Sequence, residues 1–97
     1  MCYTNEAKLF KVLSDETRLS IIKALSEKTH CACQLLEGFS ISQSTLSHHM
    51  KILTSAKLVT ASKKGKWVYY DIDAQMLAVL KTFINDISIK NQVADPC

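Results

Sequence analysis

The 97-residue chain is 47% apolar and carries 12 Lys and Arg against 9 Asp and Glu, for a formal net charge of +3. This length and composition predict one domain, small enough that a monomer buries its core only marginally, and so favour a subunit interface. No apolar run approaches membrane-spanning length, and Met1–Asn5 lacks the charged and apolar blocks of a signal peptide. We therefore expect a cytoplasmic protein without a membrane partner, whose four cysteines are reduced.

Two amphipathic helices are predicted at the start of the chain. The first covers residues 5–13, after which Ser14 and Asp15 supply a stop and an N-cap for the second, which runs to about residue 25. Arg18 is expected outside, in a surface or interface ion pair. The residues expected to face inward are Leu9, Phe10, Leu13, Leu19, Ile22 and Leu25.

The next two helices differ in character. Thr29 is a plausible N-cap for a short helix that carries Cys31 and Cys33 and ends at Gly38. Ser42 then caps a helix with two unlike faces. Its apolar face carries Leu46, Met50 and Leu53.

The opposite face of this helix presents hydroxyls, an imidazole and an ammonium, with no carboxylate. Such a face can contact base edges and phosphates without repelling a polyanion, although a solvated amphipathic helix is the alternative. Two helices joined by a short glycine-containing turn predict a helix-turn-helix over about residues 30–54. His49 is expected to be a half-buried packing or backbone-anchoring residue. The candidate DNA-binding residues of the helix are Gln43, Ser44, Thr45, Ser47, His48 and Lys51.

A β-hairpin is predicted next, because the apolar period changes to two after Ala56. Residues 58–61 and 67–72 have β-branched and aromatic character, and 63–66 separates them as a tip. A hairpin after a helix-turn-helix is a wing, here over about residues 58–72. Trp67 is expected to help anchor the base of the wing, since duplex DNA offers no unstacked base to an aromatic ring. The candidate phosphate contacts are Lys63, Lys64 and Lys66.

The charges are segregated along the chain. No acidic residue lies between Glu37 and Asp71, so residues 38–70 carry +5 and the remainder carries −2. Segregation of this kind is typical of a nucleic-acid surface and predicts double-stranded DNA as the partner.

A last helix over about residues 74–90 is expected to begin after Asp71 or Asp73. Its apolar residues cover more than one stripe, which is more than a surface helix needs. We therefore expect it to pack with the first helix and to be shared between two subunits. The tail 91–97 has no pattern and is expected to fray. The apolar residues of the helix are Met76, Leu77, Val79, Leu80, Phe83, Ile84 and Ile87.

Taken together, these features resemble the ArsR/SmtB family of winged helix-turn-helix repressors over essentially the full chain. The resemblance implies a mainly α fold with a small β-hairpin and a homodimer formed through the first and last helices. It also implies an operator-bound repressor that leaves DNA when an inducer, usually a metal or metalloid ion, binds. It implies no obligatory cofactor and no small-molecule substrate. The segments that carry it are residues 13–19, 31–35, 42–51 and 65–70.

Cys31 and Cys33 resemble the sensing motif of the family, and their chemistry supports the same role. A thiol near a helix N-terminus has a lowered pKa, and thiolates select soft ions such as As(III), Sb(III), Cd(II) and Pb(II). Residues two apart on a regular helix point about 200° apart, so chelation by both requires a distorted first turn. The alternative is a pair of small buried apolar residues.

Two departures from the family pattern bear on the inducer. The arsenic-sensing motif has a third Cys where this chain has Leu36. A third thiolate would therefore come from Cys97, from Cys2 or from the partner chain, unless another ligand serves; His30 is a weaker candidate. We place Cys97 slightly above Cys2, because a thiol on a frayed tail can swing to a preformed pair. The family's histidine site on the last helix has no counterpart, since no His follows His49.

The sequence thus predicts a DNA-binding repressor released by As(III) or Sb(III). A Cd(II)- or Pb(II)-responsive repressor and a redox or sulfur sensor of the same fold remain alternatives. An enzyme is not expected, because no Ser/His/acid set or Gly-rich phosphate loop is present. A soft-metal carrier would leave the basic wing without a purpose.

Overall fold

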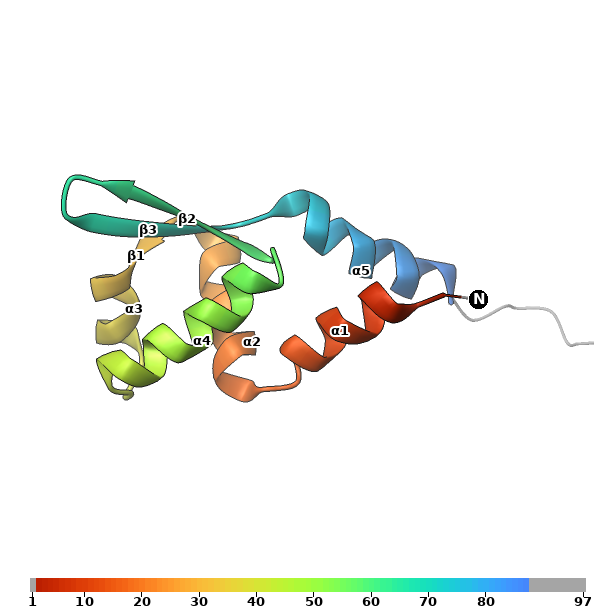
Figure 1. Cartoon of the computed structure of the whole chain (residues 1–97), viewed down its shortest axis with the longest axis horizontal. Coiled ribbons are helices and arrows are strands. Elements are labelled where there is room, and N and C mark those ends of the chain that lie inside the picture. The colour runs from red at the N-terminus through yellow and green to blue at the C-terminus, as the bar shows by residue number, and fades with distance from the viewer. Residues whose placement is uncertain (1, 88–97) are drawn as a thin grey trace, which may run out of the picture.

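The computed structural model describes residues 2–87. Cys97, the tail 91–97 and the last residues of the expected final helix lie outside this range. The elements are α1 (Thr4–Val12), α2 (Glu16–Glu27), β1 (His30–Cys31), α3 (Ala32–Gly38), α4 (Gln43–Ser55), β2 (Val59–Lys64), β3 (Trp67–Ile72) and α5 (Ala74–Asp86) (Figure 1). The mainly α fold with a small hairpin is confirmed, and the expected helix-turn-helix corresponds to α3 and α4.

The core lies between α2, α3, α4 and the sheet. Leu46, Met50 and Leu53 of α4 are 3%, 2% and 0% exposed, which confirms the apolar face expected from their spacing. Ser42 caps α4 as predicted, because its hydroxyl oxygen accepts a hydrogen bond from the Thr45 backbone N–H at 3.1 Å. α4 is therefore fixed at its first turn by the cap and along its length by apolar packing.

The inward face of α2 is as expected at Ile22 and Leu25 but not at Leu19. Leu19 is 50% exposed, whereas Ile21 is fully buried and Leu25 is 5% exposed. Two overlapping apolar stripes run along this helix, and their spacing alone cannot show which one faces the core. Phe10 was also expected inside, but it is 39% exposed and meets Phe83 of α5 edge-to-face at 5.8 Å.

The sheet has three strands in the order β1-β3-β2, one more than the predicted hairpin. β1 is only two residues long and pairs His30 with Tyr70 and Cys31 with Tyr69. The wing turns at Gly65, whose φ of +64° suits glycine. Lys63 and Lys64 precede the turn within β2, and only Lys66 lies in it.

Trp67 does not anchor the base of the wing. It is the first residue of β3, faces Lys64 across the hairpin next to the turn and is 51% exposed. Tyr70 packs against the core, and Val68 and Tyr69 are half-buried. The anchoring assignment was therefore correct for the strand but wrong for its first aromatic residue.

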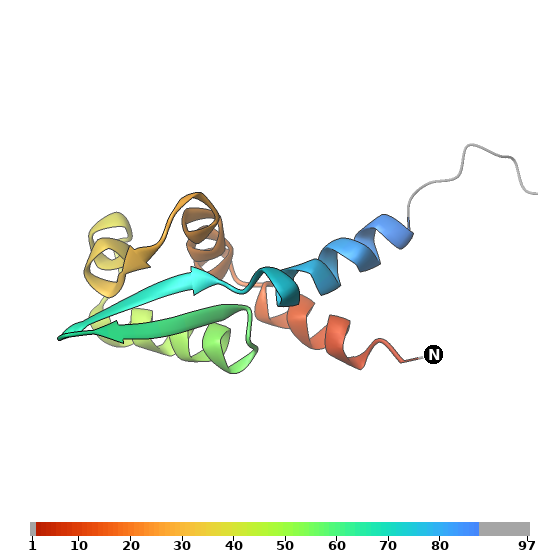
Figure 2. The same ribbon diagram turned by 90° about the horizontal axis from the view of Figure 1, so that it is seen from above.

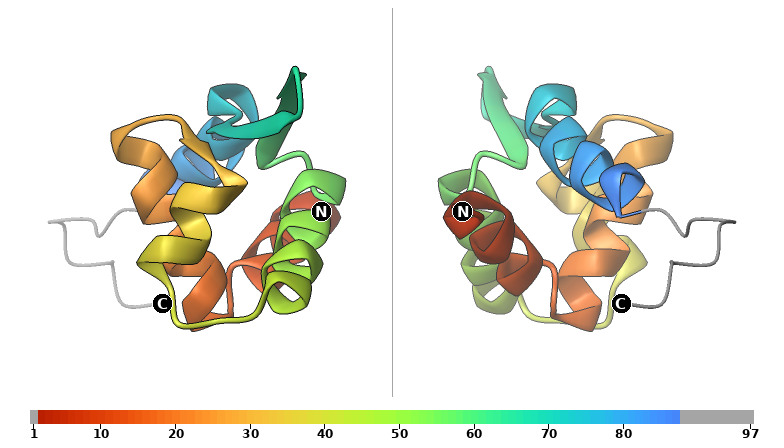
Figure 3. Two further views of the ribbon diagram at one scale, coloured as in Figure 1. Left: turned by 90° about the vertical axis from the view of Figure 1, so that its left-hand side faces the viewer. Right: turned by 90° about the vertical axis from the view of Figure 1, so that its right-hand side faces the viewer.

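The helices and the wing lie along two sides of the molecule. Seen from above, α1, α4 and the tip of the wing lie along one side, while α2, α3 and α5 lie along the other (Figure 2). α1 and α5 pack together at the end of the molecule opposite the wing tip (Figure 3, right). Tyr3 and Phe83 strengthen this contact, with ring centroids 5.3 Å apart.

Candidate nucleic-acid interface and thiol site

The exposed face of α4 carries the polar residues expected from the sequence. Gln43, Ser44, Thr45, Ser47, His48 and Lys51 are all exposed. Two of them already make hydrogen bonds at the helix start, since the Ser42 hydroxyl donates to Thr45 Oγ1 at 2.9 Å and lies 3.1 Å from Ser44 Oγ. Gln43, Ser47, His48 and Lys51 make no side-chain hydrogen bond within residues 2–87, so their polar atoms are available to a partner.

His49 points the other way and links α4 to α2. Its Nδ1 lies 3.2 Å from Arg18 Nη1 and 3.9 Å from Asp15 Oδ2, and its side chain is 12% exposed. A guanidinium can only donate, so Nδ1 is the acceptor and the ring proton is on Nε2. The half-buried position confirms the expectation for His49, but the anchor is a side chain and not the backbone.

Within residues 2–87 Arg18 makes no ion pair, and an ion pair across a subunit interface stays a prediction. Its Nε donates to the Val12 backbone oxygen at 2.5 Å while Nη1 donates to His49, so one side chain joins the end of α1 to α4. The Arg18 backbone N–H also donates to Asp15 Oδ2 at 3.0 Å. This hydrogen bond lowers the pKa of the Asp15 carboxyl. No local spacing predicts this connection, because Arg18 and His49 are 31 residues apart.

The three wing lysines are exposed, as expected. Lys63 and Lys64 are neighbours in β2, so their side chains leave opposite faces of the hairpin. Lys64 Nζ lies 5.7 Å from the centre of the Tyr69 ring, a cation–π distance that holds it over β3. Lys66 is at the turn, the outermost part of the wing.

Cys31 lies before its helix and not inside it. It ends β1 with φ −83° and ψ 164° and is the N-cap of α3, where its backbone N–H donates to Gln34 Oε1 at 2.9 Å. The expected N-cap, Thr29, instead donates its hydroxyl to Asp71 at the base of the wing. The prediction of Thr29 as cap was wrong because β1, too short to show a period of two, occupies the two residues after it.

This placement brings the two thiols together. A hydrogen bond from the Cys33 thiol lowers the pKa of Cys31, helped by backbone N–H groups of the first turn and opposed by burial. The same hydrogen bond raises the pKa of the Cys33 thiol. Because Cys31 is extended and precedes α3, the two cysteines do not lie on one regular helix, and the separation of about 200° between helical positions does not apply to them. Cys31 is 7% exposed and Cys33 is exposed, so a small ion reaches the pair from the Cys33 side.

No third ligand joins Cys31 and Cys33 in the part of the chain that the structure describes, where no three His, Cys, Asp or Glu residues form a metal-binding group. Cys2 is exposed, with its sulfur 3.5 Å from Thr4 Oγ1, and the start of α1 lies at the opposite end of the molecule from β1 (Figure 1). His30 turns its Nδ1 to the Lys28 backbone oxygen at 2.9 Å. The expectation for Cys97 falls outside the described residues.

None of the helices among residues 2–87 is long and apolar enough to cross a membrane. With a helix-turn-helix, a basic wing and an exposed polar face on α4, the fold defines a winged helix-turn-helix protein. Residues 15–61 match the family model described as bacterial regulatory protein, arsR family.

Relatives of known classification are similar in sequence to this chain over most of its length. An arsenical resistance operon repressor of Staphylococcus aureus is 42% identical over 92 residues, which cover 95% of this chain and 88% of the relative. A homolog of the cadmium resistance transcriptional regulatory protein CadC, also from Staphylococcus aureus, is 38% identical over 82 residues. These residues cover 81% of this chain and 68% of the relative. The chain therefore belongs to the arsR family of bacterial regulatory proteins.

Solved structures give the same result for the fold. The crystal structure of a possible transcriptional regulator for arsenical resistance is 32% identical, with a TM-score of 0.74 over 82% of this chain and 83% of the other. A possible ArsR-family regulator from Mycobacterium bovis, whose winged helix-turn-helix domain is described as homodimeric, is 25% identical. Its TM-score is 0.71, over 84% of this chain and 79% of the other.

Proposed function

We propose that this chain is a cytoplasmic, homodimeric repressor that binds duplex operator DNA and is released when As(III) or Sb(III) binds Cys31 and Cys33. The observation that carries the proposal is the placement of the two thiols, with Cys31 buried as the N-cap of α3 and Cys33 exposed in the first turn of the same helix. The lowered pKa of the Cys31 thiol agrees with a role as a soft ligand. The family and the arsenical resistance relative support it. The whole chain acts as a single DNA-binding domain in this proposal.

DNA contact divides between two kinds of residue. The exposed face of α4 enters the major groove, where Gln43, Ser47 and His48 have free polar atoms for base edges. The lysines of the wing and Lys51 neutralise phosphates. Ser44 and Thr45, held in the cap of α4, contact the backbone at the start of the helix.

Two copies of the chain associate through α1 and α5. Apolar side chains are exposed at this end of the molecule, including Ile84 at 54% and Ile87 at 62%. A second copy of the same surface would cover them, and a symmetric dimer would place two recognition helices on two half-sites. The homodimeric domain from Mycobacterium bovis supports this assembly.

Inducer binding starts from Cys31 and Cys33 and recruits a third ligand from outside their immediate surroundings. Cys97 is the first candidate and Cys2, from a second protomer, is the next. Closing thiolates around the ion moves the first turn of α3, and α3 packs on α4. A coupling of about 1–3 kcal/mol suffices for a 5- to 150-fold loss of operator affinity.

The test is a release titration on one operator, selected from random duplexes, with arsenite, antimonite, cadmium and lead. Cys31→Ser/Cys33→Ser keeps the size of both side chains and removes the soft ligands, so it should bind the operator and stay bound in arsenite. Cys2→Ser and Cys97→Ser serve as single-thiol comparisons. Arsenite release from the double variant at wild-type concentrations would end the sensing proposal.

The cadmium or lead alternative is favoured by the CadC homolog among the relatives and by the preference of thiolates for these ions. The same titration distinguishes this alternative from release by arsenite or antimonite, because the ion that releases DNA at the lowest concentration is the inducer. A redox or sulfur sensor would instead release DNA after peroxide, with a mass change on the cysteines.

A separate comparison tests the assignment of α4 and the wing. Lys64→Ala should weaken binding to all duplexes alike, with a salt slope lower by about 1. His48→Ala should change sequence preference by about 1–3 kcal/mol at one position. A change of preference in the Lys64 variant, without one in the His48 variant, would reverse the two roles.

A further inference from the structure

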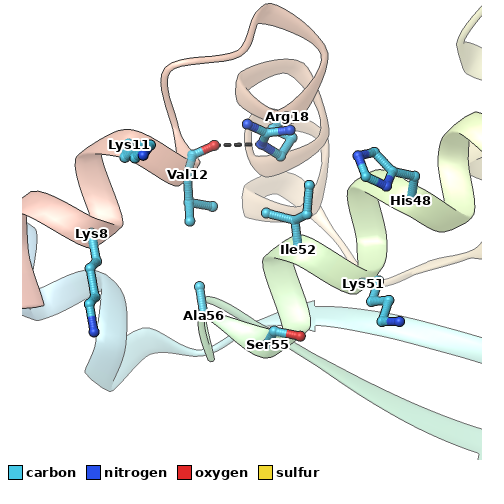
Figure 4. Close-up of a pocket in the computed structure, with 9 residues that line it drawn as sticks. All are labelled: Lys8, Lys11, Val12, Arg18, His48, Lys51, Ile52, Ser55 and Ala56. Carbon is cyan, nitrogen blue, oxygen red and sulfur yellow. Dashed lines mark hydrogen bonds between the residues drawn. The ribbon is translucent and has the colours of Figure 1, made fainter.

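A groove of about 720 Å³ opens between α1, α2 and α4, away from both the wing and the thiol pair. Its walls carry Lys8 and Lys11 from α1, Arg18 from α2, and His48 and Lys51 from α4 (Figure 4). The floor is apolar, formed by Val12, Ile52 and Ala56. Such a floor gives lysine stems a surface to lie along while their ammonium groups stay at the rim.

The groove is strongly positive. No carboxylate lines it, and four of its side chains carry a permanent positive charge. Arg18 is engaged, since its donors bind Val12 and His49. Among residues 2–87, Lys8, Lys11 and Lys51 lie within ion-pair distance of no carboxylate; the one contact of that kind is between His49 Nδ1 and Asp15 Oδ2, at 3.9 Å. Three lysines therefore line one groove without a neutralising partner in this part of the chain.

The two lysines of α1 belong by sequence to the part of the chain with excess acid, outside the basic block 38–70. Folding carries them to the basic side, because α1, α4 and the wing tip lie along the same side of the molecule (Figure 2). His48 and Lys51 are shared between the groove and the exposed face of α4. The groove is thus continuous with the candidate DNA interface.

The dimensions of duplex DNA indicate what fills the groove. A helix with its side chains is about 10–12 Å across and the major groove is about 12 Å wide, so α4 in that groove would have phosphate backbones close on both sides. The wing tip extends beyond one end of α4, and α1 lies beside its other end (Figure 1). The lysines of the wing cannot serve the phosphates at the α1 end.

We propose that Lys8 and Lys11 of α1 form, with Lys51, a phosphate-binding site that holds the DNA backbone on the side of α4 away from the wing. The partner is the sugar-phosphate backbone of duplex DNA, independent of base sequence. This proposal rests on the proposed DNA binding and extends it to α1, which then contributes to both the subunit interface and the DNA interface.

The test compares two double variants that lower the net charge equally. Lys8→Gln/Lys11→Gln removes the groove lysines, and Lys23→Gln/Lys28→Gln removes exposed lysines of α2 and its C-cap, outside the groove and outside the proposed subunit interface. The probe is a fluorescein-labelled duplex of mixed sequence about 30 base pairs long, roughly three helical turns. Fluorescence anisotropy gives the binding constant over a series of salt concentrations.

The groove variant should lose affinity and show a salt slope lower by about 2 for each protomer bound, since each phosphate contact contributes about 0.9. The Lys23→Gln/Lys28→Gln variant should keep the wild-type slope. Equal slopes for the two double variants would overturn the proposal, whereas failure of the wild type to bind the duplex would overturn the proposed function itself. Lys8→Arg/Lys11→Arg should restore the slope, and a loss that persists with arginine would assign these residues a structural role instead.

Discussion

Cys31 of the candidate thiol site is paired in register with Tyr69 of the wing, across the antiparallel ladder of β1 and β3. Cys31 therefore belongs to the same sheet as the wing, besides capping α3. Trp67, the only tryptophan of the chain, lies two residues before Tyr69 and is 51% exposed near the wing tip. An inducer at Cys31 thus has two connections to the DNA interface, one through α3 to α4 and one through β1 to the wing.

Arsenite binding is expected to change the fluorescence of Trp67 in the DNA-free protein. Movement of β1 should pass to β3, because the two strands form an antiparallel ladder with His30 opposite Tyr70 and Cys31 opposite Tyr69. The measurement is the emission spectrum during an arsenite titration. Cys31→Ser/Cys33→Ser should show no change. Release of DNA with a constant spectrum would mean that the signal travels through α3 and α4 alone.

Much of the helix-turn-helix was predictable from the sequence. Leu46, Met50 and Leu53 follow helical spacing without competition, and Ser42 is a strong N-cap, so both the core face and the start of α4 were correct. The exposed face followed from the same spacing. Local signals of this kind need no knowledge of the partner elements.

The remaining features depend on tertiary contacts. β1 is two residues long and exists only because β3 pairs with it, so the sequence indicated a helix start at Thr29 where the structure has a strand. Arg18 joins the carbonyl of Val12 to the ring of His49, a connection with no local pattern. Lys8 and Lys11 reach the basic side only after α1 is placed next to α4.

The thiol pair should titrate as a unit. At pH values between the lowered pKa of Cys31 and the raised pKa of Cys33, the pair carries one negative charge. In this state the Cys33 thiol donates to the Cys31 thiolate. Cys33→Ala removes that donor and should raise the pKa of Cys31 toward the ordinary thiol value. Ultraviolet absorbance of thiolate against pH measures this, in a background of Cys2→Ser/Cys97→Ser. A Cys31 pKa unchanged by Cys33→Ala would show that the backbone N–H groups alone stabilise the thiolate.

The two neighbouring histidines of α4, His48 and His49, should contribute unequally to the free energy of unfolding. His49→Ala removes the ring nitrogen that accepts from Arg18 Nη1 and leaves this half-buried guanidinium nitrogen without a hydrogen-bond acceptor. The free energy of unfolding should therefore fall by about 1–2 kcal/mol. His48→Ala removes an exposed ring and should change stability by less than about 0.5 kcal/mol. Urea denaturation at neutral pH measures both. Equal losses in the two variants would show that the contact between Arg18 and His49 does not hold α4.

The apolar end of the molecule should control assembly. Ile84 of α5 is 54% exposed beside α1, and Leu19 of α2 is 50% exposed, which makes them a matched pair of surface positions. Ile84→Glu would place an unpaired carboxylate in the proposed interface, so the dissociation constant of the dimer should rise at least tenfold, or about 1.4 kcal/mol. Leu19→Glu makes the same chemical change outside that interface and should leave the dimer intact.

Light scattering over a dilution series measures the dimer directly, and duplex binding provides a second readout. Loss of the dimer should reduce operator affinity more than affinity for a single half-site, because only a dimer contacts both half-sites at once. Cys31 and Cys33 lie far from α5, so the Ile84 variant should keep the lowered thiol pKa. An Ile84→Glu protein that stays dimeric at the lowest concentration would place the subunit interface elsewhere. If Leu19→Glu then dissociated, the exposed face of α2 would be that interface.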